Sequence, residues 1–260
     1  VKMVKRSSEI KAKEYGKFIP TMKLSGQENM AIDVILLDQV MKDSDFSFAL
    51  RFYKWDGYWI SIGRNQKVIP KNWLKLVDSK EINIVRRPSG GSAVLHGGGL
   101  TYALIWNSPP RKKREAYYLA SNWLINCFSR LGLPLKFGTQ LCNPNKINCF
   151  ETSSIADLID FEGNKRIGSA QLWKKGHLMQ HGEILLDPPQ DLWVEIFGTK
   201  APTPADLSIP RDDLDELLKK ACISNWPNVL WKEEKLKKEE TIEVQTRSLE
   251  YLLDPITFDD

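Results

Sequence analysis

The sequence predicts a mixed α/β (α+β) fold, in which a mixed β-sheet is flanked by helices and followed by a helical C-terminal extension. Three observations support this prediction. Runs rich in β-forming residues recur as far as Asp187, amphipathic helical segments separate them, and after residue 190 charged and apolar residues alternate with a helical period. We expect a polar arm over residues 1–22, a main domain over residues 23–190 and the helical extension over residues 191–260.

The first elements follow from local signals. The segment "SGQE" at Ser25 fits a capping box, and apolar residues then recur at helical spacing, so a helix is predicted to about Lys42. The runs "FALRFYKW" and "YWISIG" lie on either side of Asp56-Gly57, a dipeptide that favours a β-hairpin. The runs "EINIVRR" and "LTYALIW" are typical of strands before and after a glycine-rich stretch.

The second half of the chain continues this alternation. The segment "REAYYLASNWLINCFSRLG" is predicted to be a helix that ends at Gly132. Two strands, "ADLIDF" and "KRIGSAQLW", are expected to turn at residues 162–164, and "LMQHGEILLD" is expected to be another strand. Three prolines mark a linker at Pro202, Pro204 and Pro210, and "DDLDELLKKAC" and "KEEKLKKEETIEVQTRSLEYLL" then show helical periodicity.

Composition limits the classes of function. The net charge of +4 is small and dispersed, so the sequence gives no reason to expect a nucleic-acid partner. No apolar run approaches the roughly 18 residues that cross a bilayer, and the basic N-terminus lacks the apolar stretch of a secretory signal. The four cysteines show no disulfide framework, which favours a reducing compartment. We therefore expect a cytoplasmic protein that binds no membrane.

The stretch "RRPSGGSAVLHGGGLTY", residues 86–102, contains five of the 16 glycines. A phosphate-binding P-loop requires Lys-Ser or Lys-Thr after its last glycine, whereas Leu100 and Thr101 follow here. A dinucleotide fingerprint opens a helix, but this stretch leads into β-type sequence. The glycines therefore serve either the close approach of some other ligand or two tight turns around a short strand, "SAVLH".

Metal binding is disfavoured, because Cys142 and Cys149 are more widely spaced than the cysteines of most zinc sites and "HLMQH" has a strand pattern. Cys127 and Cys222 lie in apolar helical contexts. Cys149 follows a polar, turn-rich loop, and it is either an incidental loop cysteine or a nucleophile. If Cys149 is a nucleophile, a lysine in the same cleft would lower the pKa of the Cys149 thiol.

Three ordered segments, "RRPSGGSAVLH", "GNKRIGSAQ" and "LMQHGEILL", resemble the biotin/lipoate protein ligase and lipoyl/octanoyl transferase family. The segments "GQENMAIDVILLDQ" and "YWISIGRNQ" resemble its N-terminal elements, so that the resemblance covers residues 24–187. It implies the biotin/lipoate ligase catalytic-domain fold, which is class II synthetase-like, for the main domain. The family contains ATP-dependent ligases, which form an acyl-adenylate, and transferases, which carry the acyl group as a cysteine thioester.

Three features favour the transferases. The segment "CFETSSIADLIDFEGNK" resembles their cysteine loop, and it places Cys149 on the nucleophile and Lys165 on the conserved lysine. Ligases usually have Asn-Asp before the next strand, where this chain has Ala156-Asp157. The "LTY" that follows the second glycine cluster, residues 97–99, also resembles the transferases. The glycines themselves depart from the family, in which acidic residues are common at these positions. The C-terminal segment is short, which again resembles the transferases.

The resemblance therefore implies an octanoyltransferase. Cys149 would take an octanoyl group from the thioester of an octanoyl-acyl carrier protein and pass it to a lysine of a lipoyl domain, in a glycine-cleavage H protein or an E2 subunit. No cofactor and no metal would be required. Three alternatives remain: an ATP- and magnesium-dependent lipoate ligase, an amidotransferase between lipoylated proteins, and a non-enzymatic binding subunit.

The same resemblance implies the site residues. Lys165 would stabilise the Cys149 thiolate and hold the carbonyl oxygen. The remaining residues would line the acyl site: Arg87, Ser89, Gly90, Gly91 and His96 on one wall, Gly168, Ser169 and Ala170 on the other, and Gln180 and His181 at the "QHG" position. Both His96 and His181 also fit a purely structural role as hydrogen-bonded residues that order the cleft, and Arg86 and Arg87 equally fit a structural role.

Overall fold

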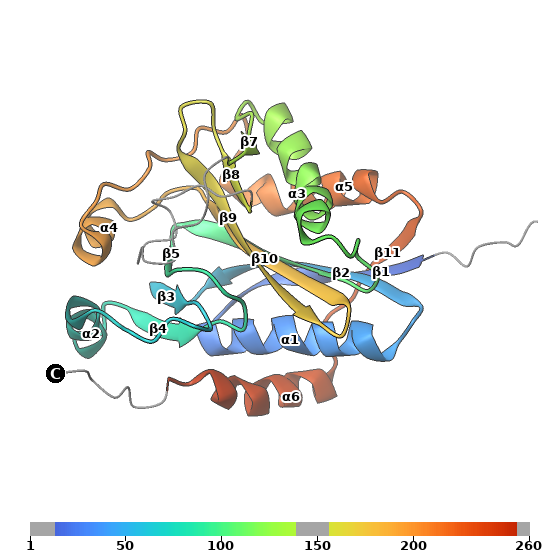
Figure 1. Cartoon of the computed structure of the whole chain (residues 1–260), viewed down its shortest axis with the longest axis horizontal. Coiled ribbons are helices and arrows are strands. Elements are labelled where there is room, and N and C mark those ends of the chain that lie inside the picture. Colours follow the sequence, from blue (N-terminus) through green and yellow to red (C-terminus); the bar gives the residue numbers. More distant parts are fainter. Residues whose placement is uncertain (1–13, 139–155, 254–260) are drawn as a thin grey trace, which may run out of the picture.

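The computed structural model describes residues 14–138 and 156–253. Within these ranges, eight strands form one mixed sheet in the order β11-β1-β2-β6-β10-β9-β8-β7 (Figure 1). β1 is parallel to both of its neighbours, and the other adjacent pairs are antiparallel. Their bounds are Glu14–Leu24 (β1), Phe46–Trp55 (β2), Gly99–Trp106 (β6), Lys136–Phe137 (β7), Asp157–Ile159 (β8), Lys165–Lys174 (β9), His177–Leu185 (β10) and Val229–Glu233 (β11). This sheet confirms the expected mixed α/β class.

A smaller sheet lies at one end of the large one (Figure 1). Its described strands are β3 (Trp59–Ile62), β4 (Asn83–Arg86) and β5 (Val94–His96), with β3 in the middle. α2 (Lys71–Asp78) and α4 (Gln190–Phe197) share a buried apolar cluster with these strands. That cluster also contains Leu185 of β10, so the small sheet is packed onto the large one.

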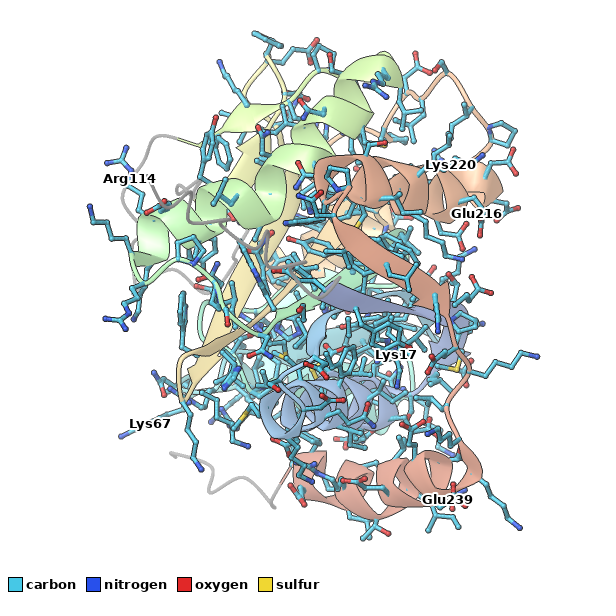
Figure 2. The ribbon with its side chains drawn as sticks, turned by 90° about the vertical axis from the view of Figure 1, so that its right-hand side faces the viewer. Lys17, Lys67, Arg114, Glu216, Lys220 and Glu239 are labelled. Carbon is cyan, nitrogen blue, oxygen red and sulfur yellow. The ribbon has the colours of Figure 1, made fainter. Side chains whose placement is uncertain are left out.

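Helices cover both faces of the large sheet. α3 (Lys113–Arg130) and α5 (Leu214–Asn225) pack on one face, and α1 (Gly26–Lys42) packs on the other. α6 (Lys238–Ser248) lies outside α1, so that α5 and α6 are on opposite sides of the molecule (Figure 2). We call the two sides of the sheet the α3 face and the α1 face.

The alternation of side chains along β6 defines these faces. Leu100, Tyr102 and Leu104 belong to the core cluster with α3 and α5. Ala103 and Ile105 belong to the cluster with α1. Because side chains alternate between faces along a strand, the register of β9 and β10 against β6 decides which side chains can share a site.

Several sequence predictions are confirmed. Ser25 and Glu28 form the capping box of α1, with the Ser25 amide donating to the Glu28 carboxylate over 3.0 Å. Gly132, just beyond α3, has a φ of 80°, the left-handed value that favours glycine at the end of a helix. β8 and β9 pair as an antiparallel hairpin around Gly163.

The predicted hairpin at Asp56-Gly57 is wrong. The turn exists, and Gly57 has a φ of 84°, but β2 and β3 do not pair. β2 already has β1 and β6 on its two edges, so the chain turns at Gly57 out of the large sheet and into the small one.

The two ends of the described chain also differ from expectation. Residues 14–22 are part of β1 rather than of a polar arm, because Phe18 and Ile19 are buried between layers. The C-terminal segment is not wholly helical: β11 pairs with β1, and Trp231 stacks on Phe18 with ring centroids 4.4 Å apart. The proposed division at residues 23 and 190 remains a prediction.

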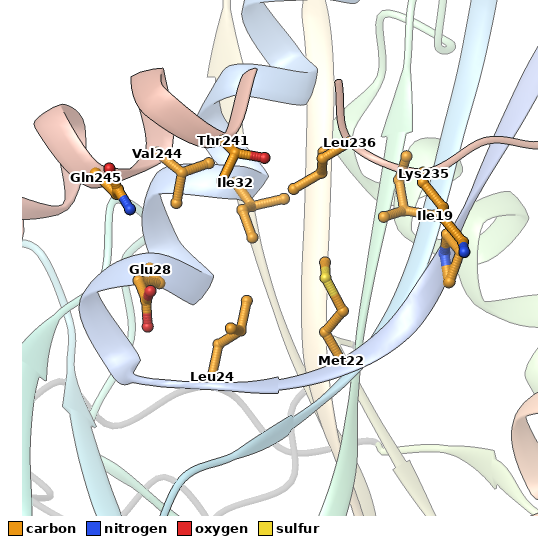
Figure 3. Close-up of a pocket in the computed structure, with 11 residues that line it drawn as sticks. Ile19, Met22, Leu24, Glu28, Ile32, Lys235, Leu236, Thr241, Val244 and Gln245 are labelled. Carbon is orange, nitrogen blue, oxygen red and sulfur yellow. The ribbon is translucent and has the colours of Figure 1, made fainter. Parts of the chain in front are cut away.

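A pocket of about 310 Å³ lies between β1, α1 and α6 (Figure 3). Apolar side chains, Met22, Leu24, Ile32, Leu236 and Val244 among them, line it. It is on the side of α1 that faces α6, and β1 of the large sheet forms one of its walls. In the described part of the chain, none of the helices has the length and apolar character to cross a membrane.

Candidate active site

Lys165 and Asp157 form a buried ion pair where β9 begins. Lys165 Nζ lies 2.8 Å from Asp157 Oδ1, and each residue is only 3% exposed. A register irregularity between β8 and β9 turns the Lys165 side chain toward Asp157, which is the neighbour of Gly168. Gly168 in turn faces Glu183 in β10, so this ion pair lies on the α1 face. An ammonium group is thus held in place where water is largely excluded.

The second glycine cluster, residues 97–99, lies close to another strand of the same protein, β10. Gly98 accepts a 2.6 Å hydrogen bond from the Asp187 amide. A Cβ atom on Gly99 would lie 2.3 Å from both the Ile184 carbonyl oxygen and Glu183 Oε1. These glycines therefore permit β6 to pack closely against β10. This close packing accounts for the high proportion of glycine in the stretch, so no phosphate ligand is needed to explain it.

The first glycine cluster is held by Arg87. Its guanidinium donates hydrogen bonds to the carbonyl oxygens of Ser61, Gly90 and Ser92, each over 2.7 Å. Gly91 has a φ of 94°, a left-handed value that few other residues adopt. Arg86 likewise donates to backbone carbonyls of residues 63 and 66. Arg87 thus fixes the backbone of the glycine loop and Arg86 that of the segment after β3, as in the structural alternative for this pair.

His96 is buried and has both ring nitrogens engaged. Nδ1 lies 2.8 Å from Glu183 Oε2, Nε2 lies 2.8 Å from Ser61 Oγ, and the ring stacks on Trp55. Thr101 also donates to Glu183 Oε2 through a short hydrogen bond. Burial lowers the pKa of His96, chiefly because the charged imidazolium would be desolvated. These contacts match the role of an ordering residue for His96.

His181 connects the glycine-rich stretch to α1. Its Nε2 lies 2.5 Å from Ser89 Oγ and its Nδ1 lies 3.0 Å from Asp33 Oδ2. Arg51 Nη1 donates to the other Asp33 oxygen over 3.2 Å, and Tyr53 Oη donates to Oδ2 over 3.1 Å. All five residues are buried. A serine, a histidine and a carboxylate are thus aligned on the α1 face.

Ser169 and Gln180 lie on the opposite face. Ser169 Oγ is 2.8 Å from Tyr102 Oη, and Gln180 donates to Tyr102 Oη and to Ser121 Oγ of α3. Burial raises the pKa of Tyr102 to about 12. This cluster fastens α3 to the sheet. The prediction placed Ser169 with Ala170 on one wall and Gln180 with His181 at the "QHG" position, whereas in the structure Ser169 and Gln180 lie on the face opposite Ala170 and His181.

The structure therefore brings together only part of the predicted set. The α1 face holds Lys165, Gly168, Ala170 and His181, and His96 bonds to Glu183 of that face. The glycine-rich loop that contacts this face holds Arg87, Ser89, Gly90 and Gly91. Cys149 and the predicted loop around it lie outside the described residues. Residues that the sequence reasoning missed are Asp33, Arg51, Asp157 and Glu183. A lone aspartate inside the apolar run "MAIDVILL" was the available signal for Asp33.

We expect Asp33→Asn to destabilise the fold by about 3–5 kcal/mol, because it leaves the Arg51 guanidinium buried without a counter-charge. Both partners are 0% exposed. Urea unfolding followed by tryptophan fluorescence measures the change. The matched control is Asp212→Asn, which removes the exposed ion pair to Lys54 and is expected to cost less than about 1 kcal/mol. Equal costs for the two variants would contradict the prediction.

Comparison with known proteins then decides the family. The family model described as "Lipoyl protein ligase A/B catalytic domain" matches residues 25–220. The chain belongs to this family. The octanoyltransferase LipM of Brevibacillus brevis is 36% identical over 191 residues, which cover 69% of this chain and 68% of the relative. The octanoyltransferase LipM of Geobacillus kaustophilus is 36% identical over 198 residues, which cover 72% and 70%.

Solved structures of the lipoyl protein ligase A/B family share the architecture. A crystal structure of lipoate-protein ligase A bound with ATP superposes with a TM-score of 0.73 and covers 90% of this chain and 94% of its own. At 19% identity, this likeness shows the fold alone. The fold implied by the motifs is therefore confirmed.

Proposed function

We propose that this protein is an octanoyltransferase of protein lipoylation, in which Cys149 carries the octanoyl group as a thioester. The observation that supports the activity most directly is the identity of 36% to proteins named octanoyltransferase, over 69% of this chain or more. It favours acyl transfer from a thioester over adenylate formation by a lipoate ligase. The same family membership supports a lipoyl-domain protein as the acceptor.

The choice of nucleophile rests on the cysteines. Cys127 and Cys222 are buried, and burial raises the pKa of Cys127 to about 11 and that of Cys222 well above its ordinary value. A thiol with a raised pKa is rarely present as the nucleophilic thiolate at neutral pH. This argument leaves Cys142 and Cys149, and the proposal assigns the thioester to Cys149 because the motif resemblance places it on the nucleophile.

Lys165 supplies the positive charge in the proposed reaction. The Cys149 thiolate attacks the octanoyl carbonyl, the carrier thiol leaves, and the Lys165 ammonium stabilises first the thiolate and then the negative oxygen of the tetrahedral intermediate. Its ion pair with Asp157 holds this ammonium in a fixed position, which limits the reorganisation needed during the reaction. A lysine of the lipoyl domain then attacks the acyl-enzyme, and the amide forms.

The activated acyl group makes ATP unnecessary in this scheme. We propose octanoyl-acyl carrier protein as the donor, a glycine-cleavage H protein or an E2 subunit as the acceptor, no cofactor, and a cytoplasmic location, where the thiol stays reduced. A lipoylated protein as the donor would make the protein an amidotransferase with the same cysteine chemistry.

The donor requirement tests the proposed function. We expect octanoyl-acyl carrier protein alone to give an octanoylated enzyme by intact mass and, on addition of an apo lipoyl domain, an octanoylated acceptor. Free octanoate is expected to give neither product, with or without ATP and magnesium. Transfer that depends on ATP would identify a ligase, and transfer only from a lipoylated protein would identify an amidotransferase.

A further inference from the structure

The hydrogen bonds of Ser89, His181 and Asp33 fix the positions of their protons. Asp33 accepts hydrogen bonds from the Arg51 guanidinium and from the Tyr53 hydroxyl, so its carboxylate is an acceptor on both oxygens. It follows that His181 Nδ1 carries a hydrogen and donates it to Asp33 Oδ2 over 3.0 Å. In neutral His181, Nε2 is then the acceptor, and the Ser89 hydroxyl donates to it over 2.5 Å.

This arrangement leaves the Ser89 oxygen free to accept a hydrogen bond from a further donor. Ser89 is in the turn of the glycine-rich stretch, and the space beside the neighbouring Gly90 is open with respect to residues 14–138 and 156–253, since a Cβ atom there would meet none of their atoms within 4 Å. A substrate group would approach the turn at this opening beside Gly90, because Ser89 itself is buried. His96 differs in this respect, because its serine partner, Ser61, already accepts a hydrogen bond from Arg87.

The Ser89–His181 pair and the Lys165–Asp157 pair lie on the two sides of β9. His181 is the register neighbour of Ala170, and Asp157 is the register neighbour of Gly168. Gly168 and Ala170 are two residues apart on β9, a distance of about 7 Å along a strand. Both pairs lie on the α1 face, so an amine that contacts Ser89 and an acyl carbonyl held by Lys165 are on the same side of the sheet.

We infer that Ser89, His181 and Asp33 form the path by which the attacking lysine of the acceptor protein loses its proton. The inference deepens the proposed function and rests on it. The lysine ammonium first releases one proton to water. The neutral amine nitrogen then forms a bond to the acyl carbon, and one of its two remaining protons passes to Ser89 Oγ while the Ser89 hydroxyl proton passes to His181 Nε2. The bond to the leaving group then breaks, the carbonyl reforms, and the imidazolium, stabilised by Asp33, returns its proton to the departing thiolate.

The test compares two nucleophiles on preloaded enzyme. Octanoylated protein, verified by mass and freed of donor, is mixed with saturating apo lipoyl domain or with hydroxylamine, and the adduct is followed in single turnover. Hydroxylamine needs little help, because its nitrogen is unprotonated at neutral pH and its adduct loses a proton readily to water. The variants are Ser89→Ala and His181→Gln. The control is His177→Gln, the same change on the same strand outside the site.

Both variants are expected to slow loading and the reaction with hydroxylamine far less than they slow transfer to the lipoyl-domain lysine. Transfer to the lipoyl-domain lysine is expected to be about 10²–10⁴-fold slower, the usual effect of losing a general base. The His177→Gln variant is expected to match the parent with both nucleophiles. Ser89→Ala removes a single oxygen, so it provides the test even if His181→Gln does not fold.

Three results would overturn the inference: unchanged transfer to lysine, equal slowing of both nucleophiles, and failure of folded Ser89→Ala to load. The first excludes the path, the second indicates a structural role, and the third places Ser89 in the loading step. A parent enzyme that loads only with free octanoate, ATP and magnesium would instead contradict the proposed function. In that case the same two nucleophiles, offered to the acyl-adenylate, still test the path.

Discussion

Cys149→Ser is expected to abolish the octanoyl adduct and to leave the fold intact. A serine hydroxyl has a pKa far above that of a thiol, so at neutral pH it supplies almost no anionic nucleophile. Intact mass after incubation with octanoyl-acyl carrier protein measures the adduct, and transfer to a lipoyl domain is expected to be lost with it. Thermal unfolding serves to confirm that the variant is folded.

The other cysteines provide matched controls. Cys127→Ala and Cys222→Ala remove buried thiols whose pKa values are raised, and both variants are expected to keep the adduct. Cys142→Ser changes the other cysteine of the same predicted loop, and this variant is expected to keep the adduct too. An adduct that persists in Cys149→Ser and disappears in one of these controls would move the nucleophile to that residue.

Lys165→Met is expected to slow octanoyl transfer by about 10²–10⁴-fold, because the reaction loses the fixed ammonium that stabilises developing negative charge. The substitution also removes the cation that pairs with the buried Asp157 carboxylate, so the free energy of unfolding falls as well. Rates are therefore compared per folded molecule, under conditions where unfolding curves show the variant to be native.

Arg166→Met is the control that separates rate from stability. Arg166 is the next residue on β9 and is also buried, and its Nε lies 2.8 Å from Asp160 Oδ2. We expect this variant to lose stability while it keeps its rate of transfer. If Lys165→Met and Arg166→Met slow the reaction equally, the role of Lys165 is structural, and the charge must come from another group.

The sequence predicted local structure well where one signal acted alone. The capping box at Ser25, the helix stop at Gly132 and the turn at Gly163 are backbone or side-chain effects within a few residues, and all three are present. The hairpin at Asp56-Gly57 failed for a non-local reason. A turn dipeptide specifies a reversal of the chain, but pairing also requires a free strand edge, and both edges of β2 are occupied.

The candidate site shows the same limit. The motifs "GSAQ" and "QHG" predict that all of their residues line the acyl site, yet neighbouring residues of a strand point to opposite faces of the sheet. Ala170 and His181 consequently lie on the α1 face, while Ser169 and Gln180 hold α3. Asp33 could not be linked to His181 from the sequence, because their contact depends on how α1 packs across the sheet.

The pairing of β1 with β11 has a consequence for synthesis of the protein. Tyr15 is paired with Leu230, so the outer edge of β1 stays uncovered until residue 230 has left the ribosome. An uncovered edge is a template for strands of other molecules, and contacts between residues so distant in sequence form slowly. The nascent chain therefore passes through a long period in which β1 can pair wrongly, and β11 ends that period when it joins the sheet.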